Sequence, residues 1–111
     1  MDREQRKAAV DAYRKRKDAP GIYAIRSLSN GAVWLGQTPD LEAIANRIFF
    51  ALRHRSHRGA RLQAAFDRHG EADLAFEVLE RIEPPETAYL LRAILKDRLA
   101  DWRTRLGGEL V

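Results

Sequence analysis

The sequence predicts an α+β domain in which a small three-stranded antiparallel sheet is flanked by helices. Three observations lead to this class: a hairpin pattern over residues 21–36, a third alternating segment over residues 74–79, and helical periodicity in the segments around them. The expected order of elements is helix, hairpin, two helices, strand and helix. At 111 residues the chain has the length of a single domain with one modest core.

The first expected element is a basic helix over residues 2–17. Asp2 can cap this helix, and Asp18-Ala19-Pro20 ends it before the hairpin. The helix carries a narrow apolar stripe and several Lys and Arg side chains on its other faces. It is therefore either a brace that packs on the domain or a basic arm.

The hairpin follows directly, because residues 22–27 alternate with the period of a strand. Asn30-Gly31 then supplies the positive φ values that a tight turn requires. Residues 32–35 return as a second strand, antiparallel to the first, and Gly36 is expected to end it. The hairpin places Tyr23 and Trp34 on paired strands.

Two helices are expected next. Thr38 is the expected cap of the first, with Pro39 at its first helical position. Its apolar positions are spaced by 3, 1, 3 and 4 residues, which indicates a buried face: Leu41, Ile44, Ala45, Ile48 and Leu52. The second helix covers about residues 59–69, and Gly70 is expected just after its end.

The third strand alternates over residues 74–79, and Pro84-Pro85 breaks the chain after it. A long last helix is expected from about Glu86 to Leu106, ending at Gly107-Gly108. Its apolar positions recur near a heptad spacing, so this face packs on the domain or on a second copy of the chain, which gives a homo-oligomer. These positions are Ala88, Leu91, Leu95, Leu99, Trp102 and Leu106.

Composition excludes several classes of protein. Hydrophobic residues make up 45% and charged residues 32% of the chain, which is typical of a globular protein. No apolar run approaches the ~20 residues of a membrane span, and no signal peptide follows Met1. The absence of Cys excludes disulfides and thiolate metal sites. We therefore expect a cytoplasmic protein with no membrane partner.

The net charge of +4 is unevenly distributed. Residues 1–17 hold seven Lys and Arg against three acids, and residues 53–69 hold five Arg and three His against one acid. Residues 71–111 reverse the sign, with nine acids against six bases. A basic face opposite an acidic one suits a nucleic acid, with DNA favoured over RNA, although a solvated surface is the ordinary alternative. The candidate phosphate contacts are Arg53, Arg55, Arg58 and Arg61.

The hairpin resembles the GIY-YIG nuclease superfamily. Gly21-Ile22-Tyr23 matches the first motif of the family, and Trp34-Leu35-Gly36 matches the second with Trp in place of Tyr. Further matches resemble its intron-homing branch: Ser56-His57, Leu62-Gln63, Phe66, Arg68-His69-Gly70, Phe76 and Val78-Leu79-Glu80. The resemblance divides the chain into an N-terminal basic helix (1–20), a GIY-YIG-like domain (21–106) and a C-terminal tail (107–111).

The resemblance implies an endonuclease that hydrolyses phosphodiester bonds with Mg²⁺ or Mn²⁺. In the family, the site is built by a Tyr from each motif, an Arg on the first helix after the hairpin, a nearby His, and a metal-binding Glu on the last helix. Tyr23 and His57 match such positions, whereas Trp34 lacks the hydroxyl of the second Tyr. The other positions read Ile44 for the Arg, Ile48 for a His found in some members, and about Ala93 for the Glu.

These replacements leave activity open, because Ile cannot contact a phosphate and Ala cannot hold a metal ion. Losing one electrostatic group typically costs about 10²–10³ in rate. Arg47, one helical turn after Ile44, is the candidate replacement, and Asp97, one turn after Ala93, is the candidate metal ligand. Arg47 and Asp97 could instead be ordinary surface residues. Tyr23 and Trp34 could instead be core aromatics, and His57 could belong only to a basic turn over residues 53–59.

Two functions therefore remain open on one fold. The first is a metal-dependent endonuclease in which Tyr23, Trp34, Arg47 and His57 form the catalytic site. The second is a catalytically inactive module that binds DNA, RNA or protein.

Overall fold

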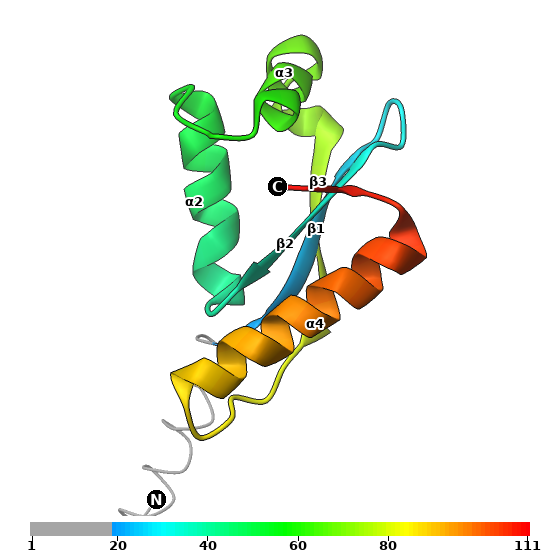
Figure 1. Cartoon of the computed structure of the whole chain (residues 1–111). Helices are drawn as coiled ribbons and strands as arrows, with labels where there is room; N and C mark the ends of the chain where they lie inside the picture. The colour runs from blue at the N-terminus through cyan, green and yellow to red at the C-terminus, as the bar shows by residue number, and fades with distance from the viewer. Residues whose placement is uncertain (1–18) are drawn as a thin grey trace, which may run out of the picture.

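The described residues form a four-stranded mixed sheet with three α-helices. The computed structural model describes residues 19–111, so the expected N-terminal helix lies outside the described residues. The sheet has the order β3-β1-β2-β4 (Figure 1). Its strands are β1 (Gly21–Ser27), β2 (Val33–Thr38), β3 (Leu74–Arg81) and β4 (Glu109–Leu110). The predicted α+β class is confirmed, but the sheet has one strand more than predicted, because β4 pairs in parallel with β2.

The hairpin forms around the predicted turn. Gly31 has a φ of 75°, and the Asn30 side chain accepts a hydrogen bond from the Ala32 N–H at 2.9 Å. The expected end of the second strand at Gly36 is wrong. Gly36 lies opposite Tyr23, and pairing continues to Thr38, which lies opposite Gly21.

Both motif glycines leave room for neighbouring groups. A Cβ at Gly36 would overlap the Tyr23 hydroxyl and would lie 2.9 Å from Cε1 of the same ring. A Cβ at Gly21 would overlap the Glu80 carbonyl oxygen and would lie 2.6 Å from Leu41 Cδ1. Since real Cβ atoms do not approach this closely, close packing alone requires glycine at both positions.

Helix α2 (Leu41–Arg53) begins later than predicted. The Asp40 side chain caps it by accepting from the Glu42 and Ala43 N–H groups at 3.1 and 3.2 Å. Thr38 and Pro39 do not fill the expected cap and first helical positions. Pairing with β1 keeps Thr38 in β2, so the helix starts only after the turn that follows.

Two further helices complete the fold. Helix α3 (Ala60–His69) ends at Gly70, as predicted, and Gly70 has a φ of 83°. A single 3₁₀ turn, η1 (Glu71–Asp73), leads into β3. Helix α4 (Ala88–Leu106) begins two residues later than predicted, because the Thr87 hydroxyl caps it by accepting from the Leu90 N–H at 3.2 Å. It ends at the left-handed Gly107, as predicted.

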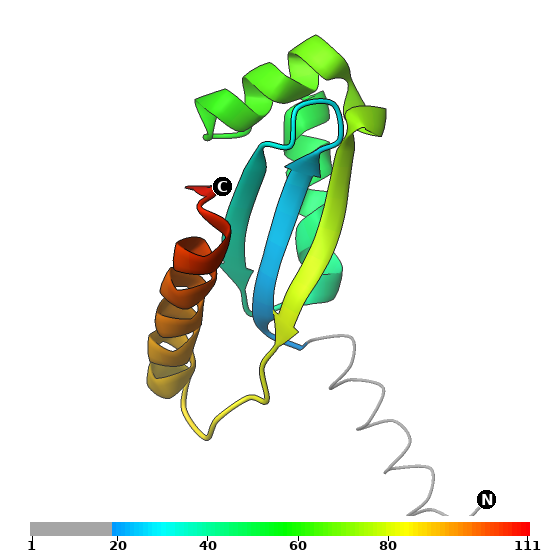
Figure 2. The same ribbon diagram turned by 90° about the vertical axis from the view of Figure 1, so that its right-hand side faces the viewer.

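The sheet separates two apolar layers, with α2 on one face and α4 on the other (Figure 2). Tyr23 and Ile25 of β1 face the α2 layer, and the alternating Ile22 faces α4. A register shift in the β1–β3 pairing leaves Leu79 as an extra residue between Val78 and Glu80. In the part of the chain described, none of the helices combines the length and apolar character that crossing a membrane requires.

Candidate nucleic-acid interface

The two aromatic residues of the motifs lie in the apolar layer beneath α2. Tyr23 is 4% exposed and Trp34 is 6% exposed. The Tyr23 ring stacks on Phe76, with ring centroids 5.4 Å apart, and its far end lies against Gly36. The same cluster contains the buried Leu52 of α2. Core side chains therefore enclose the pair that the sequence analysis assigned to a catalytic site.

Burial also decides the electrostatics of these two side chains. It raises the pKa of Tyr23 to about 12, because a phenolate in the apolar layer would lose its hydration. The Tyr23 hydroxyl therefore stays protonated at neutral pH. The indole N–H of Trp34 is buried and has no hydrogen-bond partner within residues 19–111. This layer is suited to packing, and it presents little surface to a substrate.

The helix positions that correspond to the family Arg and His contribute to the same layer. Ile48 is buried in the cluster, and Ile44 is half-buried against it. Arg47 directly precedes the buried Ile48 but is exposed, because one residue along a helix turns a side chain by about 100° around the axis. Arg47 is exposed to solvent, whereas Tyr23 is buried in the apolar layer. The catalytic assignment of Tyr23, Trp34 and Arg47 stays a prediction.

The candidate metal ligand lies on the other side of the sheet. Asp97 and Ala93 are both exposed on α4, which covers the face opposite Tyr23. Residues 19–111 contain no group of three or more His, Asp or Glu side chains that could share a metal ion. Ala93 has no side-chain atom that could bind a metal ion, and the metal role of Asp97 stays a prediction.

Glu80 has a structural role in this arrangement. Its carboxylate accepts from the Trp102 indole N–H at 2.9 Å and from Arg98 Nε at 2.8 Å. These two hydrogen bonds, with Trp102 the larger cause, hold the pKa of Glu80 below its ordinary value. The contact fastens α4 to β3. The apolar stripe of α4 packs on the sheet of the same chain, and self-association through this helix stays a prediction.

Two arginines with acidic partners flank the turn between α2 and α3, one at the end of α2 and one near the start of α3. Arg53 binds Glu71 through two hydrogen bonds, at 2.6 and 2.9 Å, and Arg61 pairs with Glu109. His57 is half-buried, and its Nδ1 accepts from the Gly59 N–H at 2.9 Å. These contacts shape the turn, and the guanidinium groups concerned already have anionic partners.

Three other arginines of this region are exposed and form no ion pair within residues 19–111: Arg55, Arg58 and Arg68. Arg55 has a φ of 55°, a left-handed conformation that normally favours glycine. Arg68 lines a hollow of about 230 Å³ next to the indole of Trp34, together with Arg61 and His69. Exposed guanidinium groups without acidic partners suit phosphate groups.

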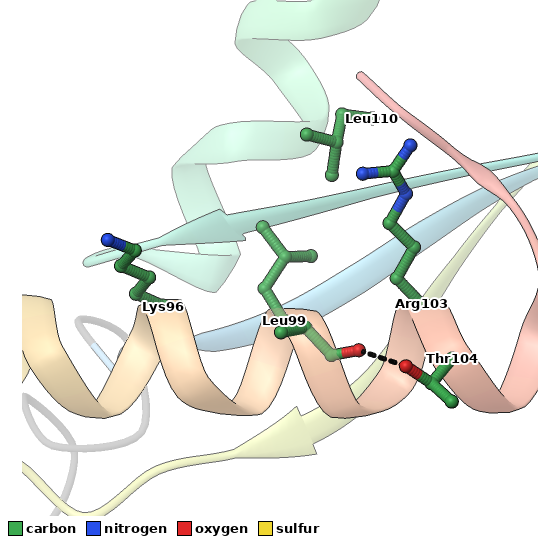
Figure 3. A pocket seen from close by; sticks show the side chains of 6 residues that line it. Lys96, Leu99, Arg103, Thr104 and Leu110 are labelled. Carbon is green, nitrogen blue, oxygen red and sulfur yellow. Dashed lines mark hydrogen bonds between the residues drawn. The ribbon is translucent and has the colours of Figure 1, made fainter.

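A second hollow lies between α4 and the end of the chain. It has a volume of about 480 Å³, and the side chains of Lys96, Leu99 and Arg103 reach it from α4 (Figure 3). Leu110 of β4 lies across from them, and Arg103 Nε donates to the Gly108 carbonyl at 3.3 Å. None of the site residues predicted from the sequence lines this hollow.

Comparison with solved structures identifies the fold. The chain is similar to the catalytic domain of the homing endonuclease I-TevI, with 28% identity, a TM-score of 0.67, and coverage of 83% of this chain and 97% of that one. It is also similar to a single-residue mutant of that domain, described as an intron endonuclease, with 27% identity, a TM-score of 0.69, and coverage of 80% and 84%. The chain is a GIY-YIG-like domain. No family model and no curated protein matches it.

The GIY-YIG-like domain has one surface feature that the sequence analysis did not single out. Phe50 on α2 is 60% exposed, although it is a large apolar residue. Its ring lies 4.3 Å from the His54 ring, measured between centroids. The signal was present in the sequence, because Phe50 falls between Ile48 and Leu52 and therefore off the apolar stripe of the helix.

Proposed function

We propose that this GIY-YIG-like domain binds nucleic acid, with DNA favoured over RNA, and that Tyr23, Trp34, Ile44 and Ile48 serve its apolar core. The observation that carries the proposal is the group of exposed arginines without acidic partners, Arg55, Arg58 and Arg68. Guanidinium groups bind phosphate oxygens through two parallel hydrogen bonds and release counterions from the polymer. The similarity to the catalytic domain of an endonuclease supports the same class of partner.

A binding titration against salt tests the proposal. Fluorescently labelled single-stranded, nicked, branched and duplex DNA, together with RNA, are titrated with the protein at several salt concentrations. Each phosphate contact contributes about 0.9 to the slope of log affinity against log salt for duplex DNA, and about 0.7 for single strands. We therefore expect a variant with Arg55, Arg58 and Arg68 all changed to Gln to lose about two to three units of slope.

The matched control removes two positive charges from the other face of the sheet. Arg92 and Lys96 are exposed on α4, and a variant with both changed to Gln is expected to bind as the wild type does. The absence of binding to any of these nucleic acids at low salt would refute the proposal. An equal loss per removed charge in both variants would show that net charge alone, rather than the positions of Arg55, Arg58 and Arg68, determines affinity.

A second candidate function is phosphodiester hydrolysis, which the similarity to an endonuclease catalytic domain favours. It would use Arg47 at the scissile phosphate, Tyr23 near the attacking water and His57 in support. Incubation of nicked, branched and single-stranded DNA with Mg²⁺ or Mn²⁺ tests it. Cleavage that disappears in Arg47→Ala and Tyr23→Phe would establish these roles. Cleavage that persists in both variants would reject them, and no cleavage would leave binding as the function.

A further inference from the structure

An aromatic pair stands on the solvent side of α2. Phe50 is 60% exposed, and the His54 ring lies beside it with 4.3 Å between centroids and 43° between planes. The buried face of this helix is made by Leu41, Ile48 and Leu52, so the core does not require Phe50. A large exposed apolar ring on a helix that already has a complete buried face is available for contact with a partner.

Positive charge surrounds this pair. Arg47 precedes Phe50 by three residues, about 4.5 Å along the helix axis, so the two side chains are neighbours. Arg53 lies three residues after Phe50, and the exposed Arg55 and Arg58 follow in the turn. Glu71 neutralises only Arg53. The other three arginines form no ion pair within residues 19–111.

We propose that Phe50 and His54 form a stacking platform for an unpaired nucleobase, with Arg47 and Arg55 contacting the phosphates on either side. The inference rests on the proposed function and narrows the ligand to single-stranded nucleic acid or to the unpaired nucleotides of a branched one. A ring face can stack only on a base whose own face is free, and bases within a duplex are already stacked on each other.

Charge complementarity favours a nucleic acid strand over a protein as the ligand of this surface. An apolar protein surface seated on Phe50 would place the guanidinium groups of Arg47 and Arg55 at its edge without acidic partners. A nucleic acid strand supplies a ring face and phosphates together, which matches an exposed aromatic pair flanked by basic side chains.

Variants at Phe50 test the platform, because an exposed side chain can be replaced with little effect on folding. A fluorescein-labelled single-stranded DNA of mixed sequence and its own duplex are titrated with each variant at fixed salt. We expect Phe50→Ala to weaken single-strand binding about 5- to 100-fold and duplex binding less than about 2-fold. Phe50→Trp should retain single-strand affinity, and its new indole fluorescence should be quenched on binding.

Two further variants separate stacking from other effects. Phe50→Leu keeps an apolar side chain without a ring and should lose as much single-strand affinity as Phe50→Ala. Tyr89 on α4 is 72% exposed, and Tyr89→Ala is the matched control, which should bind as the wild type does. Thermal unfolding of every variant checks that folding is retained.

The outcomes are distinguishable. If the wild type binds no nucleic acid, both this inference and the proposed function are wrong. If binding depends on Arg55, Arg58 and Arg68 but Phe50→Ala changes nothing, or weakens duplex and single strand equally, the platform is wrong and the proposed function stands. If Phe50→Leu binds as well as the wild type, Phe50 makes a general apolar contact, such as one to a protein, and stacking is refuted.

Discussion

The close packing of Tyr23 against Gly36 predicts that Gly36→Ala destabilises the protein. A Cβ added by Gly36→Ala would overlap the Tyr23 hydroxyl and ring. The ring cannot swing aside, because it stacks on Phe76 within the buried cluster beneath α2. Gly36 cannot retreat either, because it lies within β2 and is paired with Tyr23 across the hairpin.

The magnitude follows from this double constraint. Overpacking of a filled core typically costs 1–3 kcal/mol, and we expect about 2 kcal/mol or more for Gly36→Ala. In a domain of this size, each kcal/mol lowers the midpoint of thermal unfolding by about 4–8 °C. The variant should therefore melt at least about 8 °C below the wild type.

Urea denaturation of the variant, followed by circular dichroism, measures the loss of free energy. The matched background is Tyr23→Leu, whose shorter side chain does not reach Gly36. In that background Gly36→Ala should cost at least 1 kcal/mol less, which gives a coupling energy typical of residues in contact. A loss below about 0.5 kcal/mol in the wild type would show that Tyr23 moves freely out of the layer. An equal loss in both backgrounds would also contradict the reasoning.

Three further predictions concern the side chains of Tyr23, Glu80 and Arg55. Between pH 10 and 12 the wild type should lose up to about 2.7 kcal/mol of stability relative to Tyr23→Phe, measured by urea denaturation, because the phenol ionises only in the unfolded chain. Glu80→Gln should cost about 1–2 kcal/mol at neutral pH, and the difference should vanish as pH falls through the lowered pKa of Glu80, since the wild-type carboxylate then protonates. Arg55→Gly should gain about 0.5–1 kcal/mol in thermal unfolding by relieving the positive φ, while its affinity for single-stranded DNA falls.

Local signals predicted much of the fold. The Asn30-Gly31 turn, the apolar stripe of α2 and the glycines that follow α3 and α4 depend on residues close together in the sequence. The fourth strand could not be predicted, because Glu109–Leu110 is too short to show alternation and its pairing with β2 joins distant residues. The same pairing rules explain the wrong cap of α2, since contacts with β1 keep Thr38 in the sheet.

The sequence shows which residue types occupy the candidate site, but it does not show whether they are buried or which partners they bind. By its resemblance to the family, the sequence places Ile44 at the Arg position and about Ala93 at the Glu position, and it shows the surplus of arginines over residues 53–69. Burial of Tyr23 depends on Phe76 from a strand far along the chain. The two ion pairs that occupy Arg53 and Arg61 likewise join elements that only the tertiary structure brings together.

Gly36 leaves the room that the Tyr23 ring occupies, and this affects how family sequence motifs can be used to assign function. A sequence pattern built on these glycines and this tyrosine detects the fold rather than the activity. Close packing between the two strands requires the same residues in active nucleases and in inactive proteins. Enzymes and non-enzymes on this scaffold are better distinguished by the residues at position 44 and at about position 93, which lie outside the hairpin and its motifs.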